Sequence, residues 1–225
     1  MNIDKSLDKS LQIKPKSKRN HLFLIMLGVI LLLSSFVLNH LFWHEFKLQL
    51  MLLMFSCFIV LLLGLGKYSE PDISYNISKV AIRFNHRFGS WQVNWQDIIS
   101  FGEVRANNGF AVFSLPYIGI KLNKLDNIAN HISPRLANKL LHEQQELISL
   151  AVKYEQISKA QAILNFSPYQ LQGKTIKGPV AAWLHRTEVL ALAYGYHLFL
   201  PEDSFDRELT SFLSLLKNCQ HYVNR

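Results

Sequence analysis

A continuous apolar stretch from His21 to Gly66 constrains the fold of this chain more than any other feature. Its residues are almost all Leu, Ile, Val, Phe and Met, whereas the chain from Lys67 onward has the polarity of an ordinary soluble protein. A helix of about 20 apolar residues is enough to cross a hydrocarbon core of about 30 Å. The stretch therefore has room for two membrane-spanning helices.

Two spans can be placed within residues 21–66. The first, residues 22–43, carries no formal charge, and in the second, residues 48–66, the only amide is Gln49 at its start. Only residues 44–47 separate them, so we expect a tight antiparallel hairpin of transmembrane helices. A cleaved signal peptide fits poorly, because the first apolar run exceeds the usual length of about 7 to 15 residues and no small-x-small cleavage pattern follows it.

The distribution of basic residues predicts the orientation of the spans. Residues 1–20 hold six basic and two acidic residues, and Lys47 is the only basic residue of the hairpin turn. Four more basic residues follow the second span: Lys67, Lys79, Arg83 and Arg87. Since basic flanks stay in the cytoplasm, we expect both termini there.

The first 20 residues are expected to form a disordered cytoplasmic tail, because they carry a net charge of +4 and have almost nothing apolar to bury. The charges of this tail either only set the topology or also hold it against anionic lipid, at about 1 kcal/mol for each Lys or Arg.

Residues 70–225 are expected to form one cytoplasmic domain that contains a mostly antiparallel sheet, because apolar and polar residues alternate along them. The expected strands, in chain order, are residues 72–77, 79–85, 90–95, 97–105, 110–115 and 117–122. Within the second of them, Val80, Ile82 and Phe84 should share the buried face. Asn108 and Gly109 predict a hairpin, since both residues accept positive φ. Pro116 cannot donate to a ladder, so we expect the strand after it at a sheet edge.

Helical spacing appears in the second half of this domain. The expected helices span residues 133–152, 178–195 and 206–219, and a short strand spans residues 196–201. The first helix begins with a serine that can cap it and a proline suited to the first turn, and we expect it to pack one face on the sheet. The last is an amphipathic closing helix, which Asp206 should cap. The fold class is therefore α+β, with a helical insertion between the sheet and the closing helix.

The order of these elements resembles a family of small, uncharacterised bacterial inner-membrane proteins with two N-terminal spans and a domain similar to a pleckstrin-homology (PH) fold. The segments that carry the resemblance are GSWQVNWQDI at 89–98, the run at 117–144 and GYHLFLPEDSFDRELTSFLSLL at 195–216. The resemblance implies a PH-like sheet closed by a C-terminal helix. Residues 145–194 depart from it, being longer and more helical than a compact PH barrel needs.

Two groups of polar residues are candidate chemical sites. The run HEQQE, from His142 to Glu146, matches a zinc-protease signature up to its last position, where a second histidine is required to share the metal. We therefore interpret it as a solvated helix face. His185 and Glu188, three residues apart on the later helix, suit either metal or acid–base chemistry or an ordinary surface pair, and we favour the surface pair.

No other motif indicates chemistry. The chain lacks a Gly-x-Ser-x-Gly elbow, a P-loop and a GxGxxG run, and Cys57 and Cys219 have no spacing for a disulfide framework, zinc or redox site. We interpret both cysteines as buried hydrophobes and Trp91, Trp95 and Trp183 as core or interface anchors. We predict no catalytic, cofactor-binding or metal site.

The leading functional hypothesis is a non-enzymatic interaction module, integral to the bacterial inner membrane through two spans, that binds a protein partner or lipid headgroups. Residues 67–225 carry 17 basic and 13 acidic residues without clustering, so we expect no nucleic-acid partner. The alternative is a membrane-anchored enzyme acting on a lipid or envelope substrate. Its polar groups would be His142, Glu146, His185 and Glu188.

Overall fold

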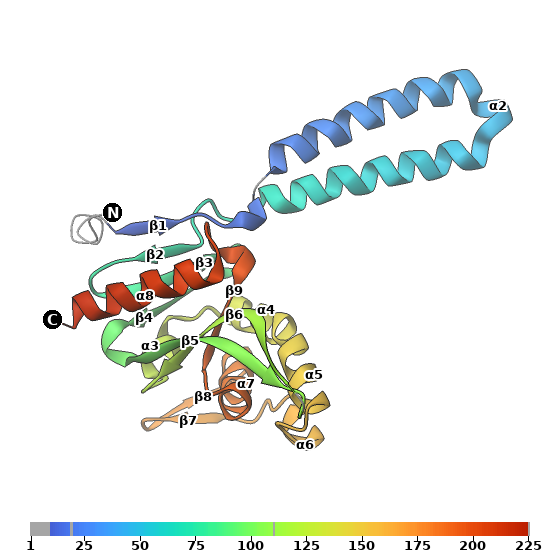
Figure 1. Ribbon diagram of the computed structural model, residues 1–225. Helices are drawn as coiled ribbons and strands as arrows, with labels where there is room; N and C mark the ends of the chain where they lie inside the picture. The colour runs from blue at the N-terminus through green and yellow to red at the C-terminus, as the bar shows by residue number, and fades with distance from the viewer. Residues whose placement is uncertain (1–9, 19, 110, 225) are drawn as a thin grey trace. The chain divides into compact units, whose positions relative to one another are not determined.

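The computed structural model describes residues 10–18, 20–109 and 111–224. It divides into two compact units, one of residues 15–72 and one of residues 73–225 with the first 14 residues, and each is described by itself. Figure 1 gives the elements of both units. The expectation of a disordered tail falls, for residues 1–9, outside the described residues.

The first unit consists of a 3-10 turn, η1 (Lys16–Lys18), and the long helix α2 (His21–Tyr68). Helical geometry breaks at Phe46 (φ −128°, ψ 37°), and the two halves of α2 lie side by side (Figure 1). The rings of His21 and Tyr68, at the two ends of α2, are 5.8 Å apart.

Two glycines let the halves of α2 approach closely. A Cβ on Gly28 would come within 2.8 Å of the Leu61 Cα, and one on Gly64 within 2.8 Å of the Ile25 backbone nitrogen. Small residues at such contacts are typical of helices that pack in lipid, where close van der Waals packing drives association.

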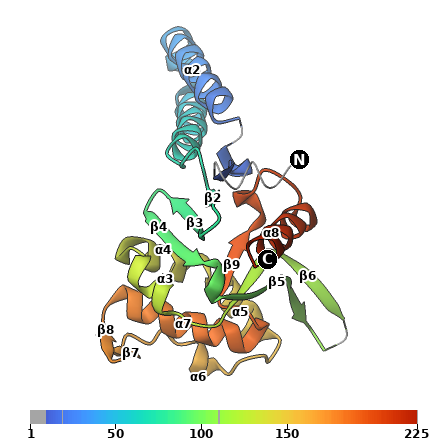
Figure 2. The same cartoon turned by 90° about the vertical axis from the view of Figure 1, so that its left-hand side faces the viewer.

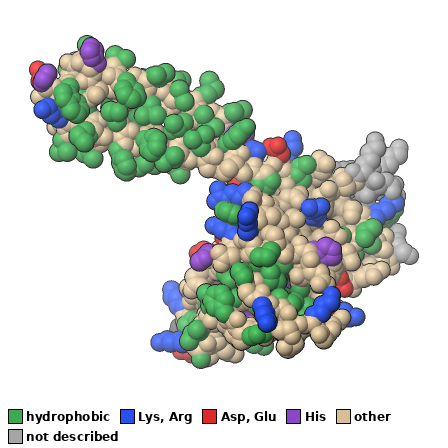
Figure 3. Space-filling model, turned by 180° about the vertical axis from the view of Figure 1, so that it is seen from behind, with side chains coloured by type: hydrophobic (Ala, Val, Ile, Leu, Met, Phe, Trp, Pro, Cys, Tyr) green, Lys and Arg blue, Asp and Glu red, His purple; other side chains and the backbone are tan. Residues whose placement is uncertain are grey.

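The outer surface of α2 is almost entirely apolar. Its buried residues are Gly28, Ser35, Leu50, Cys57 and Gly64, whereas most of its large apolar side chains are exposed, as Figure 3 shows over α2. Within the described ranges, α2 is the one helix long and apolar enough to cross a membrane, and only 11% of its most apolar window is buried.

The second unit contains a four-stranded antiparallel sheet in the order β1-β2-β3-β4. Its strands are β1 (Leu11–Ile13), β2 (Tyr75–Ile77), β3 (Ala81–His86) and β4 (Gly89–Asn94). Ile82 and Phe84 are buried as predicted, but Val80 is 70% exposed. Val80 is exposed because it precedes β3 and lies in a turn. The Ser78 N–H closes this turn by donating to the Ala81 carbonyl.

β1 corrects the expectation that residues 1–20 form a disordered tail. Leu11–Ile13 pairs with β2, opposing Ile77 to Tyr75, and the Ile13 side chain is fully buried. A short strand needs few apolar residues when it adds to an existing sheet edge, because the partner strand supplies the hydrogen bonds. The sequence-based prediction rested on the net charge of residues 1–20, and three residues are too few to show a strand pattern against it.

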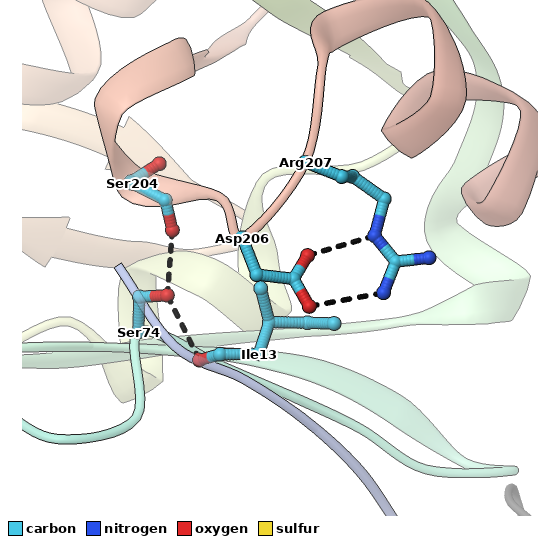
Figure 4. A network of polar contacts seen from close by, with 5 residues as sticks. All are labelled: Ile13, Ser74, Ser204, Asp206 and Arg207. Atoms are coloured by element: carbon cyan, nitrogen blue, oxygen red, sulfur yellow. Dashed lines mark hydrogen bonds and ion pairs between the residues drawn. The ribbon is translucent and has the colours of Figure 1, made fainter. Parts of the chain in front are cut away.

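Ser74 connects this N-terminal strand to the segment before the last helix (Figure 4). Its backbone N–H donates to the Ile13 carbonyl at 2.8 Å, and its hydroxyl lies 3.0 Å from that carbonyl and 2.6 Å from the Ser204 carbonyl. A hydroxyl has one proton to donate. Since the Ile13 carbonyl already accepts the Ser74 backbone N–H, we infer that the Ser74 hydroxyl donates to the Ser204 carbonyl.

A second antiparallel sheet has the order β5-β6-β9. Its strands are β5 (Ile98–Asn107), which follows the 3-10 turn η2 (Trp95–Asp97), β6 (Val112–Leu122) and β9 (Leu198–Pro201). The predicted hairpin is confirmed: the Asn108 N–H donates to the Ala111 carbonyl at 3.2 Å, and Gly109 has φ +85°.

The predicted edge strand after Pro116 is wrong. β6 continues through Pro116 and lies in the middle of its sheet, between β5 and β9. The pairing register shifts between Glu103 and Arg105, so that β6 has extra residues there, and the exposed Pro116 falls among them. A proline at such a bulge removes no ladder hydrogen bond.

Helices and a small hairpin lie between β6 and β9. In chain order they are α3 (Asp126–His131), α4 (Pro134–Glu143), α5 (Gln145–Lys153), α6 (Lys159–Ala162), β7 (Tyr169–Leu171), β8 (Lys174–Ile176) and α7 (Pro179–Tyr194). Ser133 caps α4 as predicted, by accepting the Leu136 N–H. α7 starts at the predicted proline and ends at Gly195, which has φ +80°.

The single helix expected over residues 133–152 is in fact two helices that meet at Gln144. Because of this break, α4 and α5 pack into different hydrophobic cores. Leu140 of α4 packs in the main core with the four-stranded sheet, whereas Leu147 and Ile148 of α5 pack in a second core with the β5–β6 hairpin.

The closing helix α8 (Leu209–Val223) follows the 3-10 turn η3 (Glu202–Ser204) and lies beside β5 (Figure 2). The Gln220 amide donates to the Ile98 carbonyl of β5 at 3.0 Å. Asp206 does not cap α8. Its carboxylate instead pairs with Arg207 through two contacts of 2.7 and 3.0 Å (Figure 4), and the helix starts after Glu208. Phe212 and Cys219 are buried on its inner face.

We predict that Ile13→Ala lowers the free energy of unfolding of the second unit by about 2 to 5 kcal/mol, because it leaves a cavity under a fully buried side chain. Urea unfolding of the full chain in detergent, followed by tryptophan fluorescence, measures this. Gln12→Ala, on the exposed face of the same strand, is the control and should change stability by less than about 0.5 kcal/mol. Equal effects of the two variants would contradict the pairing of β1.

We also predict that acid destabilises the domain through His197. Its Nδ1 accepts the Leu122 N–H at 3.1 Å, and burial, followed by the charge of Lys121, lowers its pKa. As pH falls below the unfolded value of about 6.5, the unfolded chain binds a proton that the folded chain resists, so stability is lost.

His197→Asn keeps an acceptor near the Nδ1 position and cannot titrate. Between pH 7.5 and pH 5 the wild type should therefore lose more stability than the variant, as measured by urea unfolding at both pH values. An equal loss in both chains would show that His197 takes no part.

Candidate functional site

The residues of the HEQQE run are not brought into a site. His142 and Glu146 are exposed on either side of the buried Gln144, at the junction of α4 and α5. In the described part of the chain no three His, Cys, Asp or Glu residues are grouped as metal ligands would be.

The other predicted pair does meet at a cavity. His185 and Glu188 of α7 both line a hollow of about 240 Å³ between α7 and the segment that contains α6. Its remaining lining residues are Ala160, Gln161, Ile163, Asn165, Ala182, Arg186, Val189 and Leu192. A cavity of about 150 Å³ already holds benzene, so this one has room for a group of several non-hydrogen atoms.

Both members of the pair are oriented by the chain around β7. The His185 Nε2–H donates to the Ser167 carbonyl at 3.2 Å, and the imidazole lies edge-on to the Tyr169 ring at 5.0 Å. The Glu188 carboxylate accepts the Tyr169 hydroxyl at 2.6 Å. Burial and the bond to Glu188 raise the pKa of Tyr169, so the phenol stays protonated and keeps donating.

Sequence reasoning missed the side chain that distinguishes this cavity, Arg186. It is only 4% exposed, its Nη1 has no hydrogen-bond partner, and its Nη2 reaches the Ala162 carbonyl at a long 3.5 Å. Among the described residues, no carboxylate lies within ion-pair distance of it. Burial lowers its pKa, but a guanidinium stays charged in proteins. The cavity is therefore built around an uncompensated positive charge.

Part of the exposed lining of the cavity is apolar. Ile163 is 72% exposed and Leu192 is 70% exposed, although both line the hollow. Phe166, near Ile163 in the segment after α6, is exposed as well. Exposed apolar side chains that line the same hollow as a buried cation suit a ligand that is charged at one end and apolar at the other.

The sequence contained a signal for Arg186. It is the only basic residue of α7, a helix whose buried residues occupy most of its circumference. A charge inside so apolar a helix is a candidate for function, because burying it without a partner is costly.

We predict that Arg186→Met leaves the free energy of unfolding unchanged or raises it. The methionine keeps an apolar stem and removes a charge that is buried without a partner, and such replacements are commonly neutral or stabilising. Urea unfolding measures the effect, with Arg105→Met on β5, whose side chain is 63% exposed, as the matched control. A loss above about 2 kcal/mol would mean that the contact with the Ala162 carbonyl is structural.

Comparisons with known proteins place the chain in a family. A model of the family described as a protein of unknown function, DUF2982, matches residues 75–222, from the start of β2 into α8. No curated protein and no solved structure matches the chain. The match includes β2 to β9 and the cavity, leaves out β1, and covers more than half of the chain. The chain therefore belongs to the DUF2982 family, which confirms the expectation of an uncharacterised family.

Proposed function

We propose that this protein is a membrane-anchored binding module: α2 crosses the bacterial inner membrane twice, both termini lie in the cytoplasm, and the second unit holds a ligand there. The pairing of β1 with β2 carries the proposal. The two strands flank α2 in the sequence, and Ile13 lies opposite Tyr75 in their ladder. A membrane segment inserted between paired strands must leave and return on the same side, so it crosses an even number of times.

The features of α2 support two crossings. Each side of the break at Phe46 is long enough for one span of about 20 residues, and the apolar surface is exposed on both. Water around so large an apolar surface is unfavourable, since monomeric soluble proteins rarely expose patches larger than a few hundred Å². The excess of basic residues outside the turn supports a cytoplasmic domain.

The arrangement of the second unit supports a PH-like interpretation. A four-stranded and a three-stranded antiparallel sheet are accompanied by a C-terminal helix, as the resemblance implies. Residues 145–194, from α5 to α7, depart from it, and this segment contributes the whole lining of the cavity.

Binding is the activity that the cavity favours. His185 is hydrogen-bonded to Ser167, and Glu188 is hydrogen-bonded to Tyr169. The Nη1 donors of Arg186 have no acceptor and can bind a ligand. A guanidinium with free donors recognises an anionic oxygen group.

One observation favours the alternative, an enzyme acting on a lipid or envelope substrate. His185, Arg186 and Glu188 are three ionisable side chains on one cavity, a combination found in acid–base catalysis. Mass spectrometry separates the two candidates. A module returns phosphatidylethanolamine and phosphatidylglycerol unchanged after incubation with the full chain in nanodiscs, whereas an enzyme of this kind changes their masses.

We predict that a membrane-impermeant maleimide labels Glu45→Cys on intact spheroplasts and labels Lys217→Cys only after permeabilisation. Both positions are exposed, one in the turn of α2 and one on α8. The wild type is the control, because Cys57 and Cys219 are buried and should not react. Labelling of Lys217→Cys on intact spheroplasts would overturn the cytoplasmic placement, and protection of Glu45→Cys would overturn the two crossings.

A further inference from the structure

We propose that the cavity beside α7 binds the zwitterionic headgroup of an aminophospholipid, with its phosphate on Arg186, its ammonium at Glu188 and its acyl chains over Ile163 and Leu192. The inference deepens the proposed function and rests on it in one respect: anchoring keeps the domain beside a bilayer that supplies such lipids.

Arg186 defines the place of the phosphate. A guanidinium carries five N–H donors, and of these only Nη2 has an acceptor, at 3.5 Å. Nη1 has none, and the side chain is more than nine-tenths buried. A phosphate oxygen at this point would supply both the missing acceptor and the missing negative charge, and it would do so in a site where water screens little.

Glu188 defines the place of the ammonium. It lies two residues from Arg186 on α7, and at about 100° per residue the two side chains leave the helix about 200° apart. Both nevertheless line the same hollow, which therefore presents one positive and one negative side chain to a ligand. A purely anionic head would meet repulsion from Glu188, whereas a head with a phosphate and an ammonium a few bonds apart complements both side chains.

The Tyr169 hydroxyl positions this carboxylate without neutralising it. Tyr169 is a neutral donor and satisfies one of the several lone pairs of the Glu188 carboxylate. Glu188 itself is exposed, so its remaining lone pairs are open to a ligand. His185, the third ionisable group on the cavity, uses its Nε2–H toward Ser167.

The apolar rim indicates a lipid rather than free phosphoethanolamine. Ile163 and Leu192 are more than two-thirds exposed and line the same cavity as the buried Arg186. Covering them with acyl chains removes apolar surface from water, which a headgroup alone cannot do. The hollow, at about 240 Å³, holds a headgroup but not the chains, which therefore lie across the rim.

The test uses the purified full chain in a non-ionic detergent and soluble short-chain probes: dihexanoyl-phosphatidylethanolamine, dihexanoyl-phosphatidylglycerol and free phosphoethanolamine. Calorimetric titration gives the dissociation constants. The ethanolamine lipid should bind more tightly than the glycerol lipid, and free phosphoethanolamine should bind about tenfold more weakly than the ethanolamine lipid, because it covers none of the rim.

Variants assign each contact. Arg186→Met should weaken both lipids by about tenfold or more, as expected for losing hydrogen bonds to a charged group. Glu188→Gln should remove the preference for the ethanolamine lipid, because only its head uses the carboxylate. Arg105→Met and Glu103→Gln, at an exposed and a half-buried residue of β5 that do not line the cavity, are matched controls and should change nothing.

Ile163→Ser and Leu192→Ser keep the test decisive if Arg186→Met fails to fold, since both positions are exposed. They should weaken the ethanolamine lipid and leave free phosphoethanolamine unchanged. The proposal is overturned if the wild type binds no probe, if it prefers the glycerol lipid, or if the rim variants bind like the wild type. Because the titration is done in detergent, its result is independent of the topology that the maleimide experiment measures.

Discussion

The pairing of β1 with β2 is the contact on which the rest of this protein depends, because it joins two segments that flank the whole of α2. The Ser74 hydroxyl and the Ile13 carbonyl, 61 residues apart in sequence, lie 3.0 Å apart. Closing so long a loop costs conformational entropy unless the intervening residues are already ordered. Packing of the two halves of α2 against each other reduces that cost, so formation of α2 and completion of the sheet assist each other.

Tyr75 extends the same constraint to the other end of the chain. Its ring packs against Phe84 of β3 and against Phe205 and Phe212 near and within α8, and its hydroxyl lies 2.9 Å from the Ser204 hydroxyl. Burial raises its pKa far above the ordinary value, so it remains a neutral hydrogen-bonding group at any physiological pH. The N-terminal strand, the first sheet and the closing helix therefore share one core.

Sequence reasoning found the elements whose signals are local and missed those that depend on tertiary context. The hairpin at Gly109, the cap at Ser133 and the stop at Gly195 rest on backbone geometry that few residue types favour, and all three are present. β1 and the central position of β6 depend on which strand lies next to them, and periodicity does not contain that information. The break at Gln144 likewise arises because two separate cores lie on either side of it.

The candidate site divides in the same way. His185 and Glu188 stood out in the sequence because their spacing places them on one helix face, and both line the cavity. Arg186 was not predicted as a site residue. What marks it as one is the absence of a carboxylate within ion-pair distance, and only a folded structure can establish that.

The unpartnered state of Arg186 is an argument about function in its own right. A chain selected only for stability would replace this arginine by an apolar residue, because burial without a counter-charge is costly and the surrounding helix is already apolar. Glu188, two residues along α7, accepts a hydrogen bond from Tyr169 and forms no ion pair with Arg186. Arg186 and Glu188 carry opposite charges and line one cavity, but they do not pair with each other. Both are therefore available to a ligand. That separation is what distinguishes a binding site from a structural ion pair.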